Sequence, residues 1–198
     1  VMAFSLTACG GGDASTNDTA KEEGSSDVIT VGFSQVGAES DWRTANTESM
    51  KSTFSEDNGY ELIFDDAQQK QENQLTAIRN FIQQEVDYIV LAPVTETGWD
   101  TVLQEAKDAG IPVIIVDRMV DVSDDSLYTA WVGSNFKLEG QKAMAWLDAY
   151  LEAKGRGDEE INLVDIQGTI GASAQIGRTE GFDEAVEAHD NWTTLAQQ

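Results

Sequence analysis

The sequence predicts an α/β fold of doubly wound parallel sheets in two lobes, the second lobe being incomplete. Strand and helix signals alternate from Val28 onward with short connections, and such alternation with right-handed crossovers builds a parallel sheet with helices on its faces. The clearest strand is the run Gly110–Val116, in which five of seven residues are Ile or Val. This composition is typical of a parallel strand that is buried on both faces.

The first lobe is expected over residues 28–132. Its strands are predicted at residues 28–33, 60–64, 88–91, 111–116 and 128–132, with a turn-rich connector at 121–126 before the last of them. Between the strands, the sequence predicts a polar helix over 41–56, a helix with Leu75, Ile78 and Ile82 on one face, and a helix carrying Trp99, Val102, Leu103 and Ala106. Gly110 is expected to end the third helix as a C-cap.

The second lobe is expected over residues 133–198, and it contains few elements. The pattern predicts a helix over 138–152, a strand over 161–166, a helix over 174–188 and a strand over 192–196. On the first of these helices, the buried face is expected to carry Ala143, Met144, Leu147 and Leu151. A sheet with so few units would expose an apolar face, so we expect the sequence to be a fragment that is truncated at both ends.

The composition excludes several classes of partner. The 198 residues include 12 basic and 36 acidic side chains, a net charge of −24, which argues against a nucleic-acid partner because such proteins neutralise phosphates with Lys and Arg. We attribute the acidity to solubility. The single histidine, His189, is expected to be a solvated loop residue. No Cys–His or His–His spacing predicts a metal site, and no cofactor is expected.

The N-terminal residues predict a lipid anchor. Residues 1–9 look like the end of an apolar signal segment without a charged start, and Leu6–Cys9 resembles the bacterial lipobox, in which the cysteine is lipidated. Residues 10–27 are almost wholly small, polar or charged, as in a flexible tether. The alternative for Cys9 is a buried free cysteine. No run reaches the ~18 apolar residues that a membrane-spanning helix needs.

Candidate binding residues follow two predicted strands at the same edge of the sheet. Asp117 and Arg118 follow the strand 111–116, and the loop 34–43 with Glu39, Trp42 and Arg43 follows the first strand. Ligands of open α/β sheets bind beyond the carboxyl ends of the strands. A carboxylate accepts hydrogen bonds, a guanidinium donates five, and an indole ring packs on the C–H face of a sugar.

Each of these residues also has a structural interpretation. Asp117 and Arg118 could form an ion pair that closes the strand, and Trp42 could be a core aromatic. Arg178 could point toward the cleft or pair with Glu180 on the surface. The loop 168–174 is expected to be a tight strand–helix turn rather than a phosphate site, and the loop 65–73 to be a solvated helix start.

Five segments together resemble one family. Residues 31–43, 68–74, 92–94 with 97–99, 111–118 and 167–173 resemble bacterial periplasmic sugar-binding proteins of the ribose/galactose type, and most of all the galactofuranose-binding members of that family. The resemblance implies two lobes joined by a hinge, with Glu39, Trp42 and Arg43 in a first binding loop, Asp117 and Arg118 as a hydroxyl-binding pair, Arg178 as the second-lobe ligand and Ser34 lining the pocket. Asp41 replaces an expected small residue, and later second-lobe ligands lie beyond Gln198.

We therefore expect a lipid-anchored, extracytoplasmic solute-binding protein of an ABC importer, rather than an enzyme. The expected ligand is a monosaccharide, a hexose such as galactofuranose, and the expected partner is an ABC permease in the membrane, with the binding protein acting as a monomer. One alternative is a sugar sensor or chemoreceptor ligand of the same fold. Another is a carbohydrate-active hydrolase that uses Glu39 and Asp117 as paired carboxylates.

Overall fold

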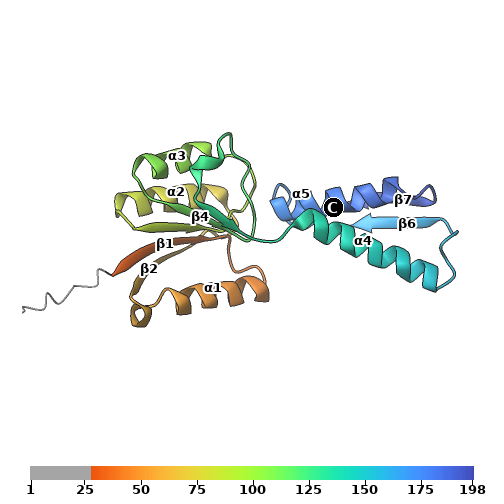
Figure 1. Cartoon of the computed structure of the whole chain (residues 1–198), viewed down its shortest axis with the longest axis horizontal. Helices are drawn as coiled ribbons and strands as arrows, with labels where there is room; N and C mark the ends of the chain where they lie inside the picture. The colour runs from red at the N-terminus through yellow and green to blue at the C-terminus, as the bar shows by residue number, and fades with distance from the viewer. Residues whose placement is uncertain (1–27) are drawn as a thin grey trace, which may run out of the picture.

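The computed structural model describes residues 28–198, which form two lobes (Figure 1). The first lobe contains a five-stranded sheet in the order β2-β1-β3-β4-β5, and every neighbouring pair is parallel. Its strands are β1 (Ile29–Gln35), β2 (Tyr60–Asp66), β3 (Tyr88–Leu91), β4 (Val113–Val116) and β5 (Ala130–Val132). The predicted α/β fold with a parallel sheet is confirmed. The predicted signal segment, Cys9 and the tether lie outside the described residues.

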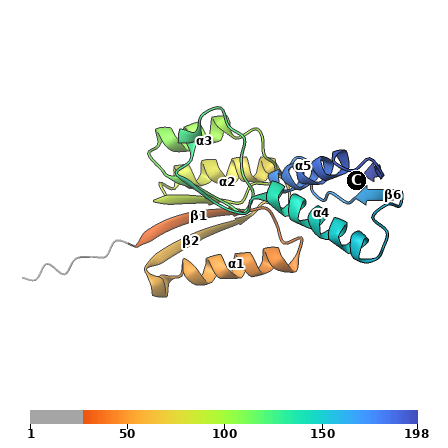
Figure 2. The same ribbon diagram turned by 45° about the vertical axis from the view of Figure 1, so that its right-hand side comes forward.

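Helices cover both faces of the first sheet. Helix α1 (Asp41–Thr53) lies on one face, whereas α2 (Gln71–Gln83) and α3 (Asp100–Asp108) lie on the other (Figures 1 and 2). Phe33 and Val90 belong to the core on the α1 side, while Phe81 and Leu103 belong to the core under α2 and α3. Two short 3₁₀ turns, Glu56–Asn58 and Asp125–Leu127, complete the lobe. Burial on both faces explains why the strands read as apolar runs.

The second lobe is a smaller parallel unit. Its elements are α4 (Phe136–Ala153), β6 (Ile161–Asp165), α5 (Ser173–Glu187) and β7 (Trp192–Gln197), and β6 pairs with β7 in parallel. Helices α4 and α5 lie side by side (Figures 1 and 2). Gly140 and Gly181 allow this close packing, because a Cβ atom at either position would overlap backbone of the facing helix. Met144 and Trp192 form part of the small core.

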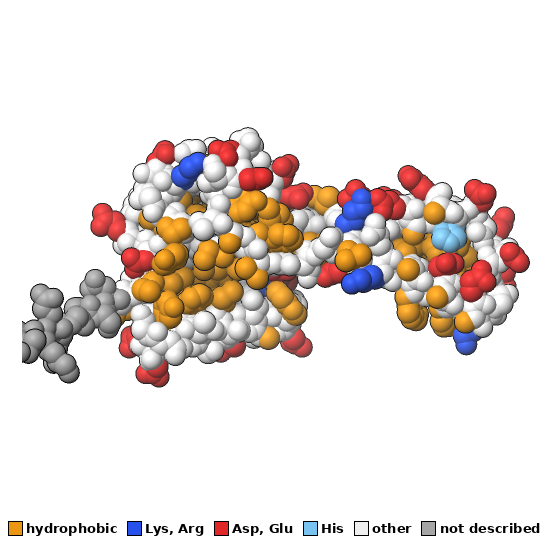
Figure 3. Space-filling model, in the orientation of Figure 1, with side chains coloured by type: hydrophobic (Ala, Val, Ile, Leu, Met, Phe, Trp, Pro, Cys, Tyr) orange, Lys and Arg blue, Asp and Glu red, His pale blue; other side chains and the backbone are white. Residues whose placement is uncertain are grey.

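Both lobes leave apolar side chains exposed. On the outer face of the second sheet, Val164 and Leu195 are 57% and 64% exposed, in accordance with the expected bare face. On the first lobe, Figure 3 shows apolar side chains gathered over the sheet beside α1, and Val132 at its edge strand is 65% exposed. Among residues 28–198, no helix has the length and apolar character needed to cross a membrane.

Several predicted details were wrong at the ends and faces of helices. Helix α4 begins at Phe136, two residues early, because the side chain of Asn135 caps it by accepting a hydrogen bond from the N–H of Leu138. Ala143 is exposed rather than buried on that helix. Trp99 precedes α3 and is fully buried, and its indole N–H donates to the carbonyl oxygen of Thr95.

The residue after β4, Asp117, has an unusual backbone conformation and contacts the segment that crosses to the second lobe. Asp117, directly after β4, has a φ of 63°, in the left-handed region that Asp and Asn tolerate better than other non-glycine residues. Its N–H donates to the carbonyl oxygen of Val132 at 2.9 Å. The crossing to the second lobe passes directly beside it, because a Cβ atom at Gly133 would overlap the carbonyl oxygen of Asp117.

The backbone of Asp117 generates a stability prediction. Asp117→Asn and Asp117→Val both remove the charge, but only valine is poorly suited to a positive φ. We expect the valine variant to be less stable than the asparagine variant by about 1–2 kcal/mol, measured as free energies of unfolding in urea. Equal stabilities of the two variants would show that the left-handed turn does not constrain this position.

Candidate ligand-binding site

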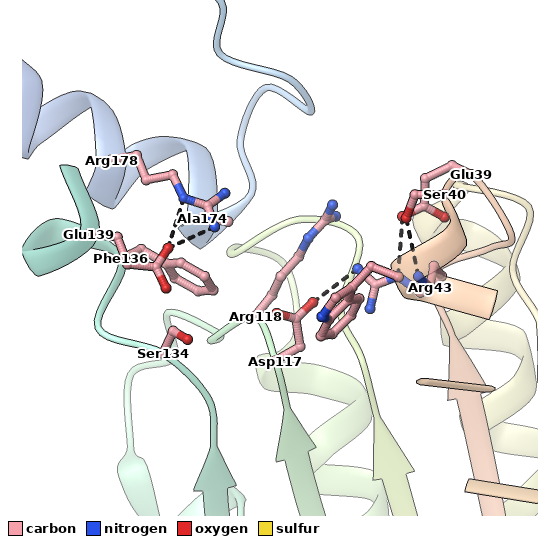
Figure 4. A pocket seen from close by; sticks show the side chains of 11 residues that line it. Glu39, Ser40, Arg43, Asp117, Arg118, Ser134, Phe136, Glu139, Ala174 and Arg178 are labelled. Atoms are coloured by element: carbon pink, nitrogen blue, oxygen red, sulfur yellow. Dashed lines mark hydrogen bonds and ion pairs between the residues drawn. The ribbon is translucent and has the colours of Figure 1, made fainter. Parts of the chain in front are cut away.

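A cavity of about 340 Å³ lies between the two lobes, beyond the carboxyl ends of β1 and β4. It is lined by Glu39, Ser40, Trp42, Arg43, Asp117, Arg118, Ser134, Phe136, Glu139, Ala174 and Arg178. Figure 4 shows Arg43 and Glu39 on the first-lobe side, Arg178 and Glu139 on the second-lobe side, and Arg118 between them. The structure thus brings six of the seven predicted binding residues together from three segments of the chain.

Arg43 links the two parts of the first lobe that line the cavity. Its Nε lies 3.2 Å from Oε1 of Glu39, and its Nη2 lies 2.9 Å from Oδ2 of Asp117. The residue is only 3% exposed, so both ion pairs are largely shielded from water. Its Nη1 is buried as well, and it has no hydrogen-bond partner among residues 28–198. A buried unpaired donor of a charged group is costly and is normally satisfied by a protein group, water or ligand.

The start of α1 fixes the position of Arg43. Ser40 is the N-cap of the helix, and its Oγ accepts a hydrogen bond from the N–H of Arg43 at 3.2 Å. Asp41 follows as the first helical residue, where a negative charge favours the positive end of the helix dipole. Asp41 is not among the residues lining the cavity. Its exposed carboxylate therefore acts on the helix end, between the two cavity residues Ser40 and Trp42.

Arg118 is oriented by backbone rather than by Asp117. Its Nη1 donates to the carbonyl oxygen of Val94 at 2.9 Å, and the residue is 9% exposed. Burial, followed by the nearby positive charge of Arg43, lowers the pKa of the Arg118 guanidinium. Asp117 forms its ion pair with Arg43 instead. The alternative of an Asp117–Arg118 ion pair that closes the strand was therefore wrong.

Arg178 faces the cavity from the second lobe. Its Nε and Nη2 both donate to Oε2 of Glu139, at 3.0 and 2.8 Å, and its Cζ lies 4.9 Å from the centre of the Phe136 ring. The alternative, a surface ion pair between Arg178 and Glu180, was wrong. Oε1 of Glu180 lies 2.9 Å from Nζ of Lys137 instead. Glu139 and Phe136 thus hold a guanidinium opposite the first-lobe residues.

Trp42 offers an aromatic surface beside these charges. It is 57% exposed, so the core interpretation of Trp42 was wrong. Its ring lies 4.9 Å from Cζ of Arg43, a cation–π contact that orders the indole at the edge of the cavity. An exposed ring in this place can pack on the apolar face of a ring-shaped ligand.

Ser34 is the predicted binding residue that the structure places elsewhere. It is fully buried within β1, it does not line the cavity, and its Oγ has no hydrogen-bond partner among the described residues. Ser34 and Gln35 are β1 residues, so the loop that reaches the cavity begins later in the sequence than expected.

Ser134, Phe136 and Glu139 are cavity residues that the sequence did not reveal. A signal was present, because these residues follow β5 at the same edge of the sheet as Asp117, around the helix cap Asn135. The loop 168–174 forms the expected turn, with positive φ at Gly168 and Gly171.

The chemistry of the cavity suits a neutral ligand that is rich in hydroxyl groups. Three guanidinium groups supply donors, and three carboxylates, those of Glu39, Asp117 and Glu139, balance their charge. Among residues 28–198, no group of His, Cys, Asp and Glu side chains could hold a metal ion. The groups that line the cavity offer hydrogen bonds to such a ligand and packing against Trp42 and Phe136.

Comparisons with known proteins give the context for this cavity. The chain is 48% identical over 170 residues to the galactofuranose-binding protein YtfQ of Escherichia coli (strain K12), covering 86% of this chain and 52% of that protein. A Mycobacterium smegmatis structure in complex with β-D-fucofuranose matches with a TM-score of 0.79 and 48% identity, covering 86% of this chain and 55% of the other.

A further solved structure, the binding protein of the arabinose ABC transporter from Shewanella sp. ANA-3 bound to L-arabinofuranose, matches with a TM-score of 0.77 and 47% identity, covering 86% of this chain and 54% of the other. The chain thus spans about half the length of these relatives. The family model of the periplasmic binding protein domain matches residues 31–198. With its parallel sheets and its cavity between two lobes, the chain belongs to the periplasmic binding protein family.

Proposed function

We propose that this chain is the sugar-binding part of a solute-binding protein that delivers a monosaccharide to an ABC permease. The observation that carries the proposal is Arg43, a cavity residue that is 3% exposed and whose Nη1 has no hydrogen-bond partner among residues 28–198. Nη1 is closed to solvent in the described arrangement, so a sugar hydroxyl oxygen would supply the missing acceptor once the side chains beside it shift on binding, while the two ion pairs hold the guanidinium in place.

The proposed sugar is a hexose in its five-membered ring form, such as galactofuranose. Three similar proteins are named for, or bound to, sugars of this ring form: galactofuranose, β-D-fucofuranose and L-arabinofuranose. Trp42 would pack on the C–H face of the ring. Glu39 and Asp117 would accept from its hydroxyl groups, and Arg118 and Arg178 would donate to its oxygens.

Binding would couple to closure of the two lobes, taken as residues 28–132 and 133–198. The first lobe supplies Arg43, Asp117 and Arg118, while the second lobe supplies Arg178. A sugar that bonds to both sides binds the closed arrangement more tightly than an open one, and it therefore shifts the population toward closure. No covalent chemistry is required, and the protein would act as a monomer and not as an enzyme.

The geometry favours binding over glycoside hydrolysis. A glycosidase needs one carboxyl group that donates a proton to the leaving oxygen. In the candidate pair, Glu39 and Asp117 each have one carboxylate oxygen engaged by the same guanidinium of Arg43, which holds both groups as hydrogen-bond acceptors beside the cavity.

The proposal is tested by calorimetric titration of the protein, at its natural length, with a panel of monosaccharides. We expect galactofuranose or a related furanose to bind, and Arg43→Met to weaken binding by about 10- to 100-fold, because hydrogen bonds to charged groups are lost. Arg178→Met, at a more exposed position, should also weaken binding, because it removes hydrogen bonds from a charged group to the sugar. Lys51→Met on the exposed side of α1 is the matched control and should bind normally.

Two results would contradict the proposal: a folded protein that binds no monosaccharide of the panel, or an Arg43→Met variant that binds as tightly as the parent. Sugar release from a glycoside, in contrast, would favour the hydrolase.

We also propose that Cys9 is lipidated and holds the protein at the outer face of the cell membrane through the segment 10–27. Cells fed a clickable fatty acid should label the parent protein, and Cys9→Ala should remove the label and release the protein from the membrane fraction. Unchanged labelling of the Cys9→Ala variant would rule out this anchor.

A further inference from the structure

The two lobes contact each other beside the cavity through two hydrogen bonds. The N–H of Met119 donates to Oγ of Ser173 at 2.7 Å, and the N–H of Glu96 donates to the carbonyl oxygen of Gly171 at 2.8 Å. Met119 and Glu96 belong to the first lobe, whereas Gly171 and Ser173 precede and begin α5 in the second lobe. None of these four residues lines the cavity, so the contact is complete without any ligand atom.

The second-lobe side of this contact is preorganised. Ser173 is 7% exposed, and the N-cap residue of α5 is Ala172, which makes no side-chain cap. The Ser173 hydroxyl bonds across to the other lobe instead. Gly171 has a φ of 83°, a backbone conformation that directs its carbonyl oxygen toward Glu96 and that favours glycine. Its N–H is fixed in turn by Oε1 of Gln175 at 3.1 Å.

The first-lobe side is equally constrained. The N–H of Asp121 donates to the carbonyl oxygen of Glu96 at 2.7 Å, which ties together the two segments that receive the second lobe. Gln71 donates to the carbonyl oxygen of Thr97, and Arg118 donates to that of Val94. The loop 94–97 is therefore hydrogen-bonded at both of its ends. The residue that bonds to Val94, Arg118, also lines the cavity.

We propose that Ser173 and Gly171 form a latch that favours the closed arrangement of the lobes without contacting the sugar, Ser173 being its positioning residue. This inference rests on the proposed function, since closure matters only if the lobes close on a ligand. The described arrangement resembles that of the β-D-fucofuranose complex, with a TM-score of 0.79 over 86% of the chain, a share that includes both lobes.

The latch sets how much of the sugar's binding energy goes into closing the lobes. The apparent dissociation constant equals the intrinsic one divided by the fraction of molecules in the competent arrangement. Loss of one buried neutral hydrogen bond reduces that fraction and should weaken apparent affinity by about 3- to 10-fold. The preference among sugars stays unchanged, because the residues that contact the sugar are intact.

The test measures lobe distance and sugar affinity separately, in the protein at its natural length. Spin labels at Ser49→Cys on α1 and Lys142→Cys on α4, both exposed, report the distance between lobes in a Cys9→Ser background. In the absence of sugar, Ser173→Ala should move molecules from the short to the long distance. With sugar, affinity should fall about 3- to 10-fold while the ranking of sugars is retained.

Two variants serve as controls. Ser173→Thr keeps a hydroxyl oxygen and should restore the short distance. Ser123→Ala removes a hydroxyl that bonds to Asp100 within the first lobe, and it should change neither distance nor affinity. If Ser173→Ala does not fold, Gly171→Ala perturbs the second hydrogen bond of the latch and should give the same shift.

A distance distribution in Ser173→Ala identical to that of the parent would overturn the latch. The distance measurement uses no sugar, so it decides the latch even if no monosaccharide of the panel binds. In that case a shifted distance supports the latch while the proposed sugar-binding function fails.

Discussion

The candidate site depends on one buried charge, the guanidinium of Arg43. It comes from the first turn of α1, and it bridges Glu39 in the preceding loop and Asp117 at the end of β4. A charge buried to this extent is tolerated only when it is paired, and removal of one partner is strongly destabilising. The same pairing leaves Nη1 without a hydrogen-bond partner in the part of the chain that the structure describes. Arg43 thus both joins two segments of the sheet edge and provides an unused donor beside the cavity.

The backbone around Asp117 connects this charge to the contact between the lobes. Asp117 adopts a left-handed conformation and so directs its carboxylate to Arg43. The next residue, Arg118, fixes the loop that begins at Val94, and Met119 bonds to Ser173 of the second lobe. Of three consecutive residues, Asp117 lines the cavity, Arg118 supports the neighbouring loop and Met119 contacts the second lobe. The three residues that follow β4 therefore connect the cavity to the contact between the lobes.

The strands of the first lobe were predictable because they are buried on both faces and carry runs of Ile and Val. The cavity residues on loops were predictable in part, because the carboxyl ends of parallel strands meet at one edge of the sheet. This rule places Glu39, Trp42, Arg43, Asp117 and Arg118, whereas Arg178 was expected at the cavity only from the family resemblance.

The partners of these residues could not be read from the sequence. Arg43 and Asp117 are far apart along the chain, and the choice between Arg43 and Arg118 as the partner of Asp117 is decided by a left-handed turn that sequence alone does not specify. Ser34 was assigned to the pocket although β1 continues past it into the core. The exposure of Ala143 was not predictable, because apolar residues occur on more than one face of α4 and the sequence does not show which face packs against α5.

The central claim is that the unpaired Nη1 of Arg43 awaits a sugar oxygen. A crystal structure of the protein at its natural length with galactofuranose bound tests it directly. The account predicts a sugar oxygen within about 2.7–3.2 Å of Nη1, with Asp117 still paired to Nη2 of Arg43. A sugar bound away from Arg43, or one that leaves Nη1 without an acceptor, would contradict it.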